Sequence, residues 1–305
     1  MPVARRWVAF LLWGLTCPLT GLPAQVECGM GPAFRFQAED RQVQVRSSND
    51  GALLYGGALA INLDGAPNAY HPRGRPAGAL DSICNGADAV LPDGSRVRGS
   101  KDCGKFLEKF NEARDSGWIA PGKPRIEFFG VAVQGSGDLA RVPCIQSAGP
   151  FAGFFVSQTS LLADPAKPLC DARRYLNSLE VPFFVLPANS EFLRRGMRKG
   201  DIAAAIHAPT GQVVFAIFGD TGPANKLGEG SLALALMLRK RPLLPKPVRG
   251  QAEKEAMPGG VYMLMFPHSD AGPPYVAGRI SEAGQRLLGP WGGEQRLRAC
   301  LAARE

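Results

Sequence analysis

The stretch VVFAIFGDTGPANKLGEGSLALALM, residues 213–237, decides the fold. Its first six residues are apolar and mostly β-branched or aromatic, which predicts a buried strand over 213–218. The part that begins at Ser231 is apolar nearly all round and ends in Arg239 and Lys240, two cations that suit a helix C-terminus. Glycines and a proline lie between the two parts. We therefore predict a strand, a sharp turn and a helix that packs across the sheet.

Five further apolar runs have the length of a strand and are separated by Gly, Pro, Asp or Asn residues. They are Ile126–Val133, Gly153–Gln158, Val181–Leu186, Asp201–His207 and Val261–Phe266. Six such runs with few long helical periods favour a closed barrel over an α/β sheet. We predict a mainly β protein with a few helices, built on a closed six-stranded barrel whose core spans about residues 126–267.

The segments outside this core are more irregular. Residues 64–104 are rich in Gly, Pro, Asp and Asn, which predicts a long loop region, and loops of that length in a compact domain are usually functional. Phe106–Arg114 is expected to form a short helix. Ser281–Leu288 and Glu294–Ala303 predict two closing helices in a C-terminal helical extension over 280–305.

The N-terminal residues 1–24 have the pattern of a secretory signal peptide. Arg5 and Arg6 precede an apolar run, and Leu22-Pro23-Ala24 suits cleavage before Gln25. A lipoprotein signal ending at Cys17 is the weaker alternative. We expect residues 25–305 to be a single domain that is secreted or periplasmic, with no membrane association after signal removal.

Six cysteines remain after such cleavage: Cys28, Cys84, Cys103, Cys144, Cys170 and Cys300. An even number in an oxidising compartment favours three disulfides, although six cysteines allow 15 pairings. The short separations favour Cys84 with Cys103 and Cys144 with Cys170. The chain has no Cys-x-x-Cys motif and its three histidines, His71, His207 and His268, stand apart, so a zinc site is not expected.

The net charge of +8 falls to +6 when Arg5 and Arg6 are removed, and this surplus favours an anionic partner. The basic residues are scattered and no aromatic stripe accompanies them, so we expect no nucleic-acid binding. The chain also lacks Gly-x-Ser-x-Gly, His-Glu-x-x-His and a phosphate-binding Gly-Lys-Ser/Thr loop. These absences argue against the corresponding nucleophilic, zinc and phosphate chemistries.

Two carboxylates flank the central turn. Asp220 ends an apolar strand and Glu229 precedes the apolar helix nine residues later, so a chain that doubles back would bring them face to face. Glycoside hydrolysis needs such a pair, one as general acid and one as base or nucleophile. The simpler alternative is that Asp220 caps a turn and Glu229 complements the helix dipole.

Four stretches resemble the fungal-type chitosanases of glycoside hydrolase family 75 and their bacterial relatives. They are GDTGPANKLGEGSLALAL from 219, GFFVSQTSL at 153–161, RYLNSLEVPFFVLP at 174–187 and LDGAPNAYHP at 63–72. The resemblance covers roughly residues 60–267 and places the two essential carboxylates of the family on Asp220 and Glu229. It implies an endo-acting, inverting hydrolase of β-1,4-linked glucosamine polymers that uses no metal and no organic cofactor. The turn also resembles the Asp-x-Gly unit of double-psi β-barrels.

Further residues are candidates for contact with a polysaccharide substrate. Asp64 is expected to enter the cleft as a base or amine ligand, and Lys226 and Ser231 to orient the carboxylates or bind substrate. Tyr70 and Trp118 are candidates for stacking on sugar rings. The other candidates lie in the same two motifs and are Asn68, His71 and Thr221. Because Glu has the higher reference pKa, we predict Glu229 as the general acid and Asp220 as the base or its partner, although the helix N-terminus beside Glu229 favours the charged form of that acid.

Chitosan is a polycation, whereas the predicted mature chain is basic. A negative cleft on a basic body would resolve this conflict if the acids at 64, 81, 220, 229 and 270 converge. If they do not, peptidoglycan becomes the favoured substrate. A lytic transglycosylase on the same fold and a non-catalytic wall-binding module remain the alternatives, and we expect a monomer.

Overall fold

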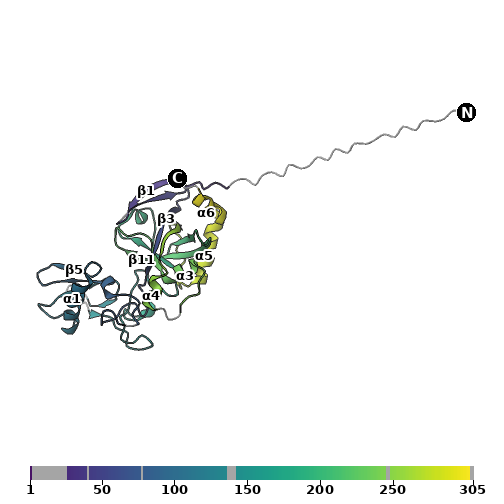
Figure 1. Cartoon of the computed structure of the whole chain (residues 1–305). Coiled ribbons are helices and arrows are strands. Elements are labelled where there is room, and N and C mark those ends of the chain that lie inside the picture. The colour runs from purple at the N-terminus through teal and green to yellow at the C-terminus, as the bar shows by residue number, and fades with distance from the viewer. Residues whose placement is uncertain (2–25, 40, 77, 136–141, 245–247, 303–305) are drawn as a thin grey trace.

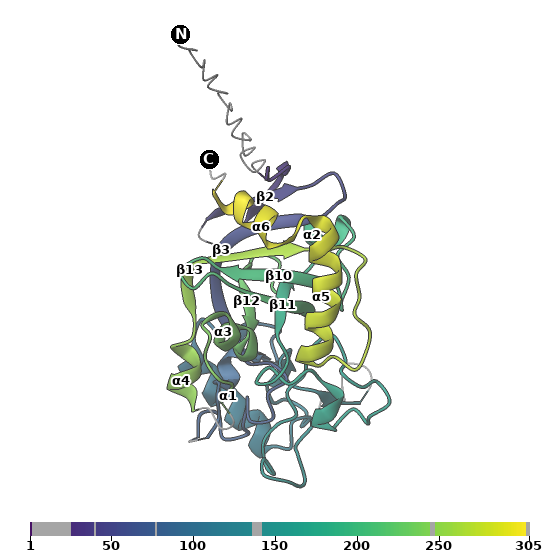
Figure 2. The ribbon, with the colours of Figure 1, turned by 90° about the vertical axis from the view of Figure 1, so that its right-hand side faces the viewer.

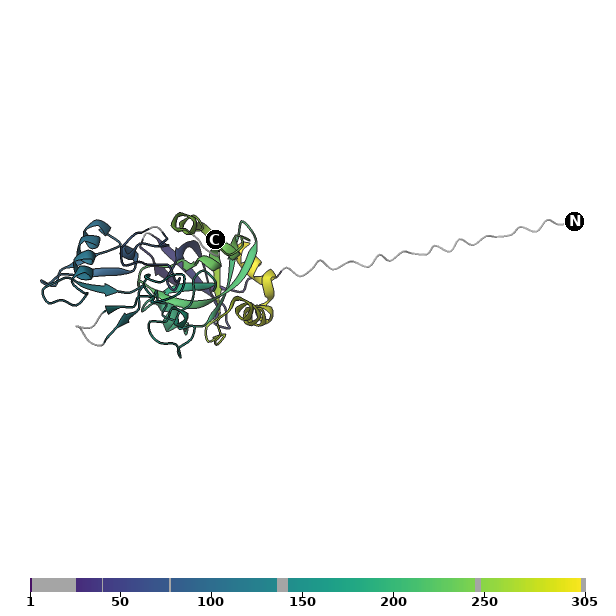
Figure 3. The same ribbon diagram turned by 90° about the horizontal axis from the view of Figure 1, so that it is seen from below.

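The computed structural model describes residues 1, 26–39, 41–76, 78–135, 142–244 and 248–302. Figures 1 and 3 show an elongated molecule, with a lobe that contains α1 and β5 at one end and a β-barrel covered by α5 and α6 at the other. The predicted signal segment, 1–24, lies outside the described residues apart from Met1. In the described part of the chain, no helix has the length and apolar character needed to cross a membrane.

The barrel is closed and six-stranded, as the sequence predicted. Its strands follow one another around the barrel in the order β3 (Leu53–Asn62), β12 (Glu229–Ser231), β9 (Phe183–Pro187), β11 (Gln212–Gly222), β10 (Ile202–His207) and β13 (Met257–Met265). Antiparallel pairing of β13 with β3 closes the ring. Two neighbouring pairs, β3 with β12 and β9 with β11, are parallel, so the sheet is mixed.

Two of the six predicted barrel strands were assigned wrongly. The run at 126–133 forms β6 (Arg125–Phe128) of a separate sheet, and the run at 153–158 contributes only isolated bridges. Their places in the barrel are taken by β3 and β12. The barrel strands therefore begin at Leu53, well before the predicted core boundary of 126, because an apolar run predicts a strand but does not show which sheet it joins.

The side chains of the barrel strands form two cores. One core contains Phe184, Ala205, Ala216 and Met263. The other contains Val185 and the strand residues that point to the same side of the sheet as Val185. The second core includes residues of α5 (Ala277–Trp291) and α6 (Gly293–Ala302), which pack on the barrel as Figure 2 shows. Because α5 and α6 cover the barrel from outside, the face that carries Val185 is the outer one, and the side chains of the other core fill the barrel interior.

The remaining described elements complete the barrel end and the lobe. Strands β1 (Gly31–Gln37) and β2 (Gln42–Ser47) extend the sheet from β3, and α2 (Glu191–Arg194), α3 (Leu232–Leu238) and α4 (Arg249–Glu253) are short helices beside the barrel. In the lobe, α1 (Cys103–Asp115) packs on a three-stranded sheet whose strands lie in the order β5 (Arg96–Arg98), β4 (Ala87–Val90) and β6. A separate two-stranded sheet consists of β7 (Val133–Gln134) and β8 (Val142–Pro143). The helices predicted near 106–114, 231–240, 281–288 and 294–303 are confirmed as α1, α3, α5 and α6.

Three disulfides brace the chain. The two predicted pairs, Cys84–Cys103 and Cys144–Cys170, are confirmed, with sequence separations of 19 and 26 residues. The third joins Cys28 to Cys300 across 272 residues and ties the first described strand region to α6. Two of the cross-links therefore lie in the lobe and its connections, while the third fastens the two ends of the barrel region.

Candidate active site

Gly219 creates a β-bulge that directs Asp220 toward the outer face of the barrel. Phe218 pairs with Phe184 of β9, but the next residue that pairs with β9 is Asp220, opposite Val185. The extra residue turns Asp220 onto the face of Val185, whereas a regular strand would direct it with Phe218 into the barrel. Gly219 has no room for a side chain, because a Cβ there would lie 2.6 Å from Cβ of Phe183.

Glu229 reaches the same place from the other side of β9. It pairs with Val185 in the antiparallel ladder between β12 and β9, so Val185 has Asp220 on one side and Glu229 on the other. The Glu229 side chain extends over β9 toward β11, where its Oε2 would lie 3.1 Å from a Cβ on Gly222. Because both pair with Val185, Asp220 and Glu229 lie on the same face, and each residue is 8% exposed.

The Asp220 carboxylate is held by backbone donors. Its Oδ1 accepts hydrogen bonds from the N–H groups of Ser160, at 2.9 Å, and of Thr221, at 2.8 Å. Burial raises the pKa of Asp220, the hydrogen bonds from Ser160 and Thr221 oppose that rise, and the Glu229 carboxylate adds to it. Asp220 is therefore oriented firmly and also biased toward its protonated form.

Glu229 has a cation beside it. Nζ of Lys226 lies 2.6 Å from its Oε1, and the Glu229 side chain is 10% exposed against 46% for Lys226. The ammonium group balances the charge of the nearly buried carboxylate. This contact places Lys226 beside one of the two acids, and it distinguishes the surroundings of Glu229 from those of Asp220.

Asp64 joins the pair from the loop that follows β3. The hydroxyl group of Tyr70 donates a hydrogen bond of 2.8 Å to its Oδ1, and Gly130 packs so closely that a Cβ there would lie 2.7 Å from the same oxygen. Burial raises the pKa of Asp64 well above its ordinary value, and the Asp220 carboxylate raises it further, against the effect of Tyr70. Asp64 and Asp220 therefore form an interacting carboxylate pair.

A fourth acid, Asp81, extends this group. Its negative charge raises the pKa of both Asp64 and Tyr70, and burial raises its own pKa against hydrogen bonds from Asn85 and Ser82. We call Asp64, Asp81, Asp220 and Glu229 the acid cluster. Of the five acids predicted to converge, only Asp270 lies apart, where its Oδ1 accepts from Gly272 N and Tyr275 Oη near the start of α5. Four of the five acids named in the sequence analysis therefore come together.

Several predicted substrate contacts have structural roles instead. Ser231 is fully buried, and its Oγ accepts hydrogen bonds from the N–H groups of Phe183 and Leu234, so it caps α3 and cannot reach a substrate. Asn68 is 6% exposed and its Nδ2 donates to the Gly78 carbonyl oxygen, so it braces the loop.

The predicted aromatic stacking residues are also unsuitable. Tyr70 is 2% exposed and is engaged with Asp64. The Trp118 ring packs in the lobe core at 5.3 Å from the Phe110 ring and 5.8 Å from the Phe128 ring. Tyr70 is thus buried and Trp118 is half-buried, in line with the commoner fate of large aromatic side chains.

Of two other predicted residues, one lies at the acid cluster and the other in a separate pocket. Thr221 stays at the cluster, where its N–H contacts Asp220 and its Oγ1 lies 3.3 Å from Ser160 Oγ. His71 lies in a pocket that Arg73 and Arg114 also line, and its Nδ1 accepts from the N–H of Arg73 at 3.0 Å.

Sequence reasoning missed Ser160, Gly219 and Gly130. Each acts through its backbone or through the lack of a side chain, and such roles leave only a weak signal in one sequence. The signal that could have found Gly219 is its position between an apolar strand and a carboxylate, because a bulge there changes the face on which the acid lies.

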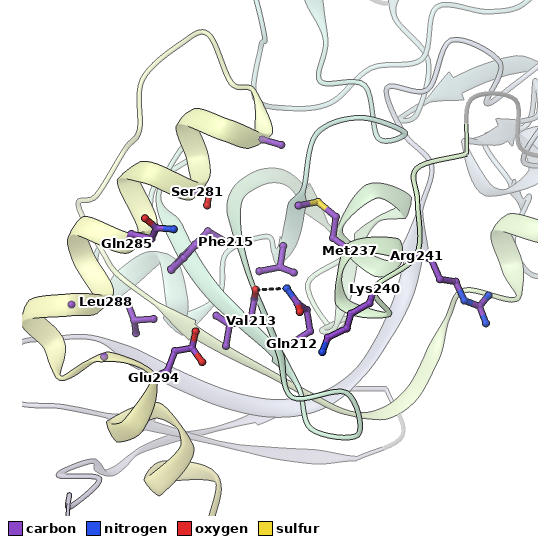
Figure 4. A pocket seen from close by; sticks show the side chains of 14 residues that line it. Gln212, Val213, Phe215, Met237, Lys240, Arg241, Ser281, Gln285, Leu288 and Glu294 are labelled. Carbon is purple, nitrogen blue, oxygen red and sulfur yellow. Dashed lines mark hydrogen bonds between the residues drawn. The ribbon is translucent and has the colours of Figure 1, made fainter.

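A pocket of about 690 Å³ lies elsewhere, between α5, β11 and the end of α3 (Figure 4). Its lining includes Lys240, Arg241 and one carboxylate, Glu294, which pairs with Arg298 at 2.8 Å. It contains no member of the acid cluster. A pocket with a single carboxylate lacks the pair that hydrolysis needs, so the acid cluster is the candidate active site.

No protein-family model matches the chain, and no curated protein matches it in sequence at a significant level. In the described part of the chain, no group of three or more His, Cys, Asp or Glu side chains has the arrangement of a metal site.

Proposed function

We propose that this protein is a secreted, endo-acting polysaccharide hydrolase that resembles the chitosanases and cleaves β-1,4 glucosamine linkages with inversion. The observation that carries the proposal is the placement of Asp220 and Glu229 on opposite sides of Val185, on one face of the barrel. Two strand spacings separate their backbones by roughly 9–10 Å. That backbone separation is compatible with the roughly 6.5–9.5 Å between carboxyl groups that leaves room for a water molecule in an inverting enzyme.

The surroundings of the acids favour a reversal of the roles that the reference pKa values suggested. Asp220 and Asp64 carry raised pKa values and interact with each other, so this pair holds a proton at a higher pH than an isolated Asp. Glu229 is paired with Lys226. We assign the protonation of the leaving oxygen to the Asp64 and Asp220 pair and the activation of water to Glu229.

The acid cluster supports a cationic amino-sugar polymer as substrate. Four carboxyl groups gather in one place on a chain of net charge +8. The Asp64 and Asp220 pair holds one proton and Lys226 balances one carboxylate, which leaves the group with a net negative charge. Within a Debye length of about 8 Å at physiological salt, this local charge outweighs the charge of the distant surface. A glucosamine ammonium group would thus be attracted at the cleavage site, although the whole molecule is basic.

The test is to incubate the mature protein with chitosan, carboxymethyl-cellulose and peptidoglycan and to measure new reducing ends. We expect Asp220→Asn and Glu229→Gln each to reduce kcat on chitosan by about 10²- to 10⁴-fold, the usual contribution of general acid–base catalysis. Glu282→Gln, on the exposed side of α5, is the matched control and should keep the wild-type rate. A wild-type protein inactive on all three polymers, or full activity in either acid variant, would contradict the proposal.

The basic net charge favours one second candidate, a cell-wall lytic enzyme acting on peptidoglycan, an anionic polymer. A lytic transglycosylase needs one acid and no water-activating base. In that case peptidoglycan would be cleaved without addition of water, and one of the two acid variants would retain most of its activity.

A further inference from the structure

Phe129 is an exposed aromatic residue at the edge of the acid cluster. Its side chain is 55% exposed, whereas Phe128, the preceding residue and the last of β6, is 8% exposed and packs against the aromatic core of the lobe. Consecutive residues at the end of a strand point to opposite sides. Phe128 therefore anchors the strand in the lobe, and Phe129 presents its ring to solvent.

The backbone that carries this ring is fixed on both sides. The N–H group of Phe129 donates to the Gly86 carbonyl oxygen at 2.9 Å, and its own carbonyl oxygen accepts from Nε2 of Gln158 at 3.2 Å. Gly130 donates to the same Gly86 oxygen at 3.0 Å. An exposed ring on a backbone held in this way loses little conformational entropy when a ligand covers it.

Two independent routes connect Phe129 to the acids. In the first, the adjacent residue Gly130 packs directly on Asp64, as its close approach to Oδ1 shows. In the second, Gln158 donates its N–H to the Gly130 carbonyl oxygen at 3.1 Å, and two residues later Ser160 N donates to Asp220 at 2.9 Å. Phe129 thus lies beside the cluster rather than on a distant surface.

We propose that Phe129 is a stacking platform for a pyranose ring of the bound glycan, next to the site of cleavage. The proposal rests on the hydrolase function argued above. A ring in a β-1,4-linked glucan-type polymer presents C–H groups on its broad faces, and these fit the electron-rich face of an aromatic ring. Because Phe has no polar group, the platform recognises the face of the sugar and accepts amino and acetamido units alike. Selection between those units is left to the acid cluster.

The test has two parts. Binding of glucosamine and N-acetylglucosamine hexamers is measured by titration calorimetry in the Glu229→Gln variant, which is expected not to cleave them. Steady-state kinetics are measured in the protein that keeps Glu229. We expect Phe129→Ala to weaken hexamer binding about tenfold and to raise KM with little change in kcat, because the ring binds substrate and transition state alike. Phe129→Trp should restore binding, and Phe129→Leu, which is apolar but has no aromatic face, should not. Ile119→Ala, which removes a 52% exposed side chain, is the control and should change nothing.

The possible outcomes separate this inference from the hydrolase proposal. Hexamer binding that stays within twofold in Phe129→Ala, equal rescue by Leu and Trp, or a parent protein that binds neither hexamer would overturn the platform. If the protein hydrolyses the polymer and Phe129→Ala leaves KM unchanged, the platform is overturned and the hydrolase proposal stands. Binding that depends on Phe129 without any hydrolysis would support the platform and overturn the proposed catalytic activity.

Discussion

At the scale of single residues, the site combines acids whose surroundings differ. Asp64 and Asp220 are buried near each other. Burial disfavours the charged form of each carboxyl group and therefore raises its pKa. Glu229 has Lys226 at 2.6 Å. Placing similar carboxyl groups in unequal environments is a general way in which enzymes separate acid and base roles.

The buried acids also make stability depend on pH. A carboxyl group whose pKa is higher in the folded state favours folding at low pH, and this contribution is lost as the pH rises through the folded-state pKa. We therefore expect Asp64→Asn to raise Tm by a few degrees at pH 7 and above, with a difference that shrinks as the pH falls toward the unfolded pKa. Thermal unfolding from pH 3 to 9 would check this. A lower Tm in the variant at pH 7 would show that Asp64 is a net stabilising group.

Tyr70 offers a second test at this scale. Its hydroxyl donates to Asp64 and lowers the pKa of that carboxyl. Tyr70→Phe removes this donor and should raise the pKa of Asp64 further. The limb of the pH–rate profile on which activity falls with rising pH, because the general acid loses its proton, should then move to higher pH. The lost hydrogen bond should cost about 0.5–1.5 kcal/mol of stability. An unchanged pH–rate profile would indicate that Asp64 takes no part in the rate-determining proton transfer.

At the scale of elements, the bulge in β11 links the fold to the chemistry. It turns Asp220 from the inner to the outer face of the barrel, beside Val185 and Glu229. A short parallel contact between β12 and β3 brings Glu229 to the same level. The site is therefore assembled by strand register, and each acid occupies its position because of the residues with which its strand pairs.

Gly219→Ala tests this dependence. The new methyl group would lie 2.6 Å from Phe183 Cβ and 2.9 Å from Leu176 Cδ1, so the bulge must shift. We expect a loss of about 1–3 kcal/mol of stability, typical of overpacking, and a fall in activity larger than the fall in the folded fraction explains. Gly259→Ala, where a Cβ meets no atom within 4 Å, is the matched control. Denaturant unfolding and activity assays would show whether the two variants differ as expected.

The sequence predicts the barrel and four of its strands correctly because each of those strands contains a continuous apolar run bounded by turn-forming residues. It does not predict β3 as a barrel strand, because glycines interrupt it. Gly56 is needed there, since a Cβ would lie 2.4 Å from the Tyr262 ring on β13. The strand β12 is only three residues, Glu229–Ser231, and its pairing depends on partners distant in sequence. Such tertiary contacts leave no local pattern.

The same distinction applies to the candidate site. Asp220, Glu229 and Asp64 could be predicted because carboxylates beside apolar strands and Gly-rich turns are visible in the sequence. Phe129 could not, because its exposure follows from the position of β6 in the lobe. The misassignment of Ser231 has a similar cause, since a serine before a helix is equally compatible with capping and with substrate binding.

At the scale of the whole molecule, the disulfide Cys28–Cys300 joins the two ends of the described chain. Arginines reinforce the junction, because Arg296 Nε donates to the Cys28 carbonyl oxygen at 2.9 Å and Arg46 Nη2 donates to that of Cys300 at 2.6 Å. The guanidinium of Arg296 also lies 4.2 Å above the Trp291 ring. This junction holds α6 against the barrel on the side away from the lobe (Figure 2).

The long loop makes this cross-link the one expected to matter most for stability. Closing a loop of 272 residues removes more entropy from the unfolded chain than closing one of 19, and the chain-entropy relation gives about 5.6 kcal/mol for the first loop and about 3.2 kcal/mol for the second. We expect the double substitution of Cys28 and Cys300 by Ala to lower Tm by about 10–20 °C, more than the same change at Cys84 and Cys103. Calorimetry on both double variants would measure this. The opposite order, with the variant lacking Cys28–Cys300 melting at the higher temperature, would mean that the arginine contacts alone hold the two ends together. The cross-link Cys84–Cys103 would then be the more important brace, because it fastens the loop region that brings Asp81 to the acid cluster.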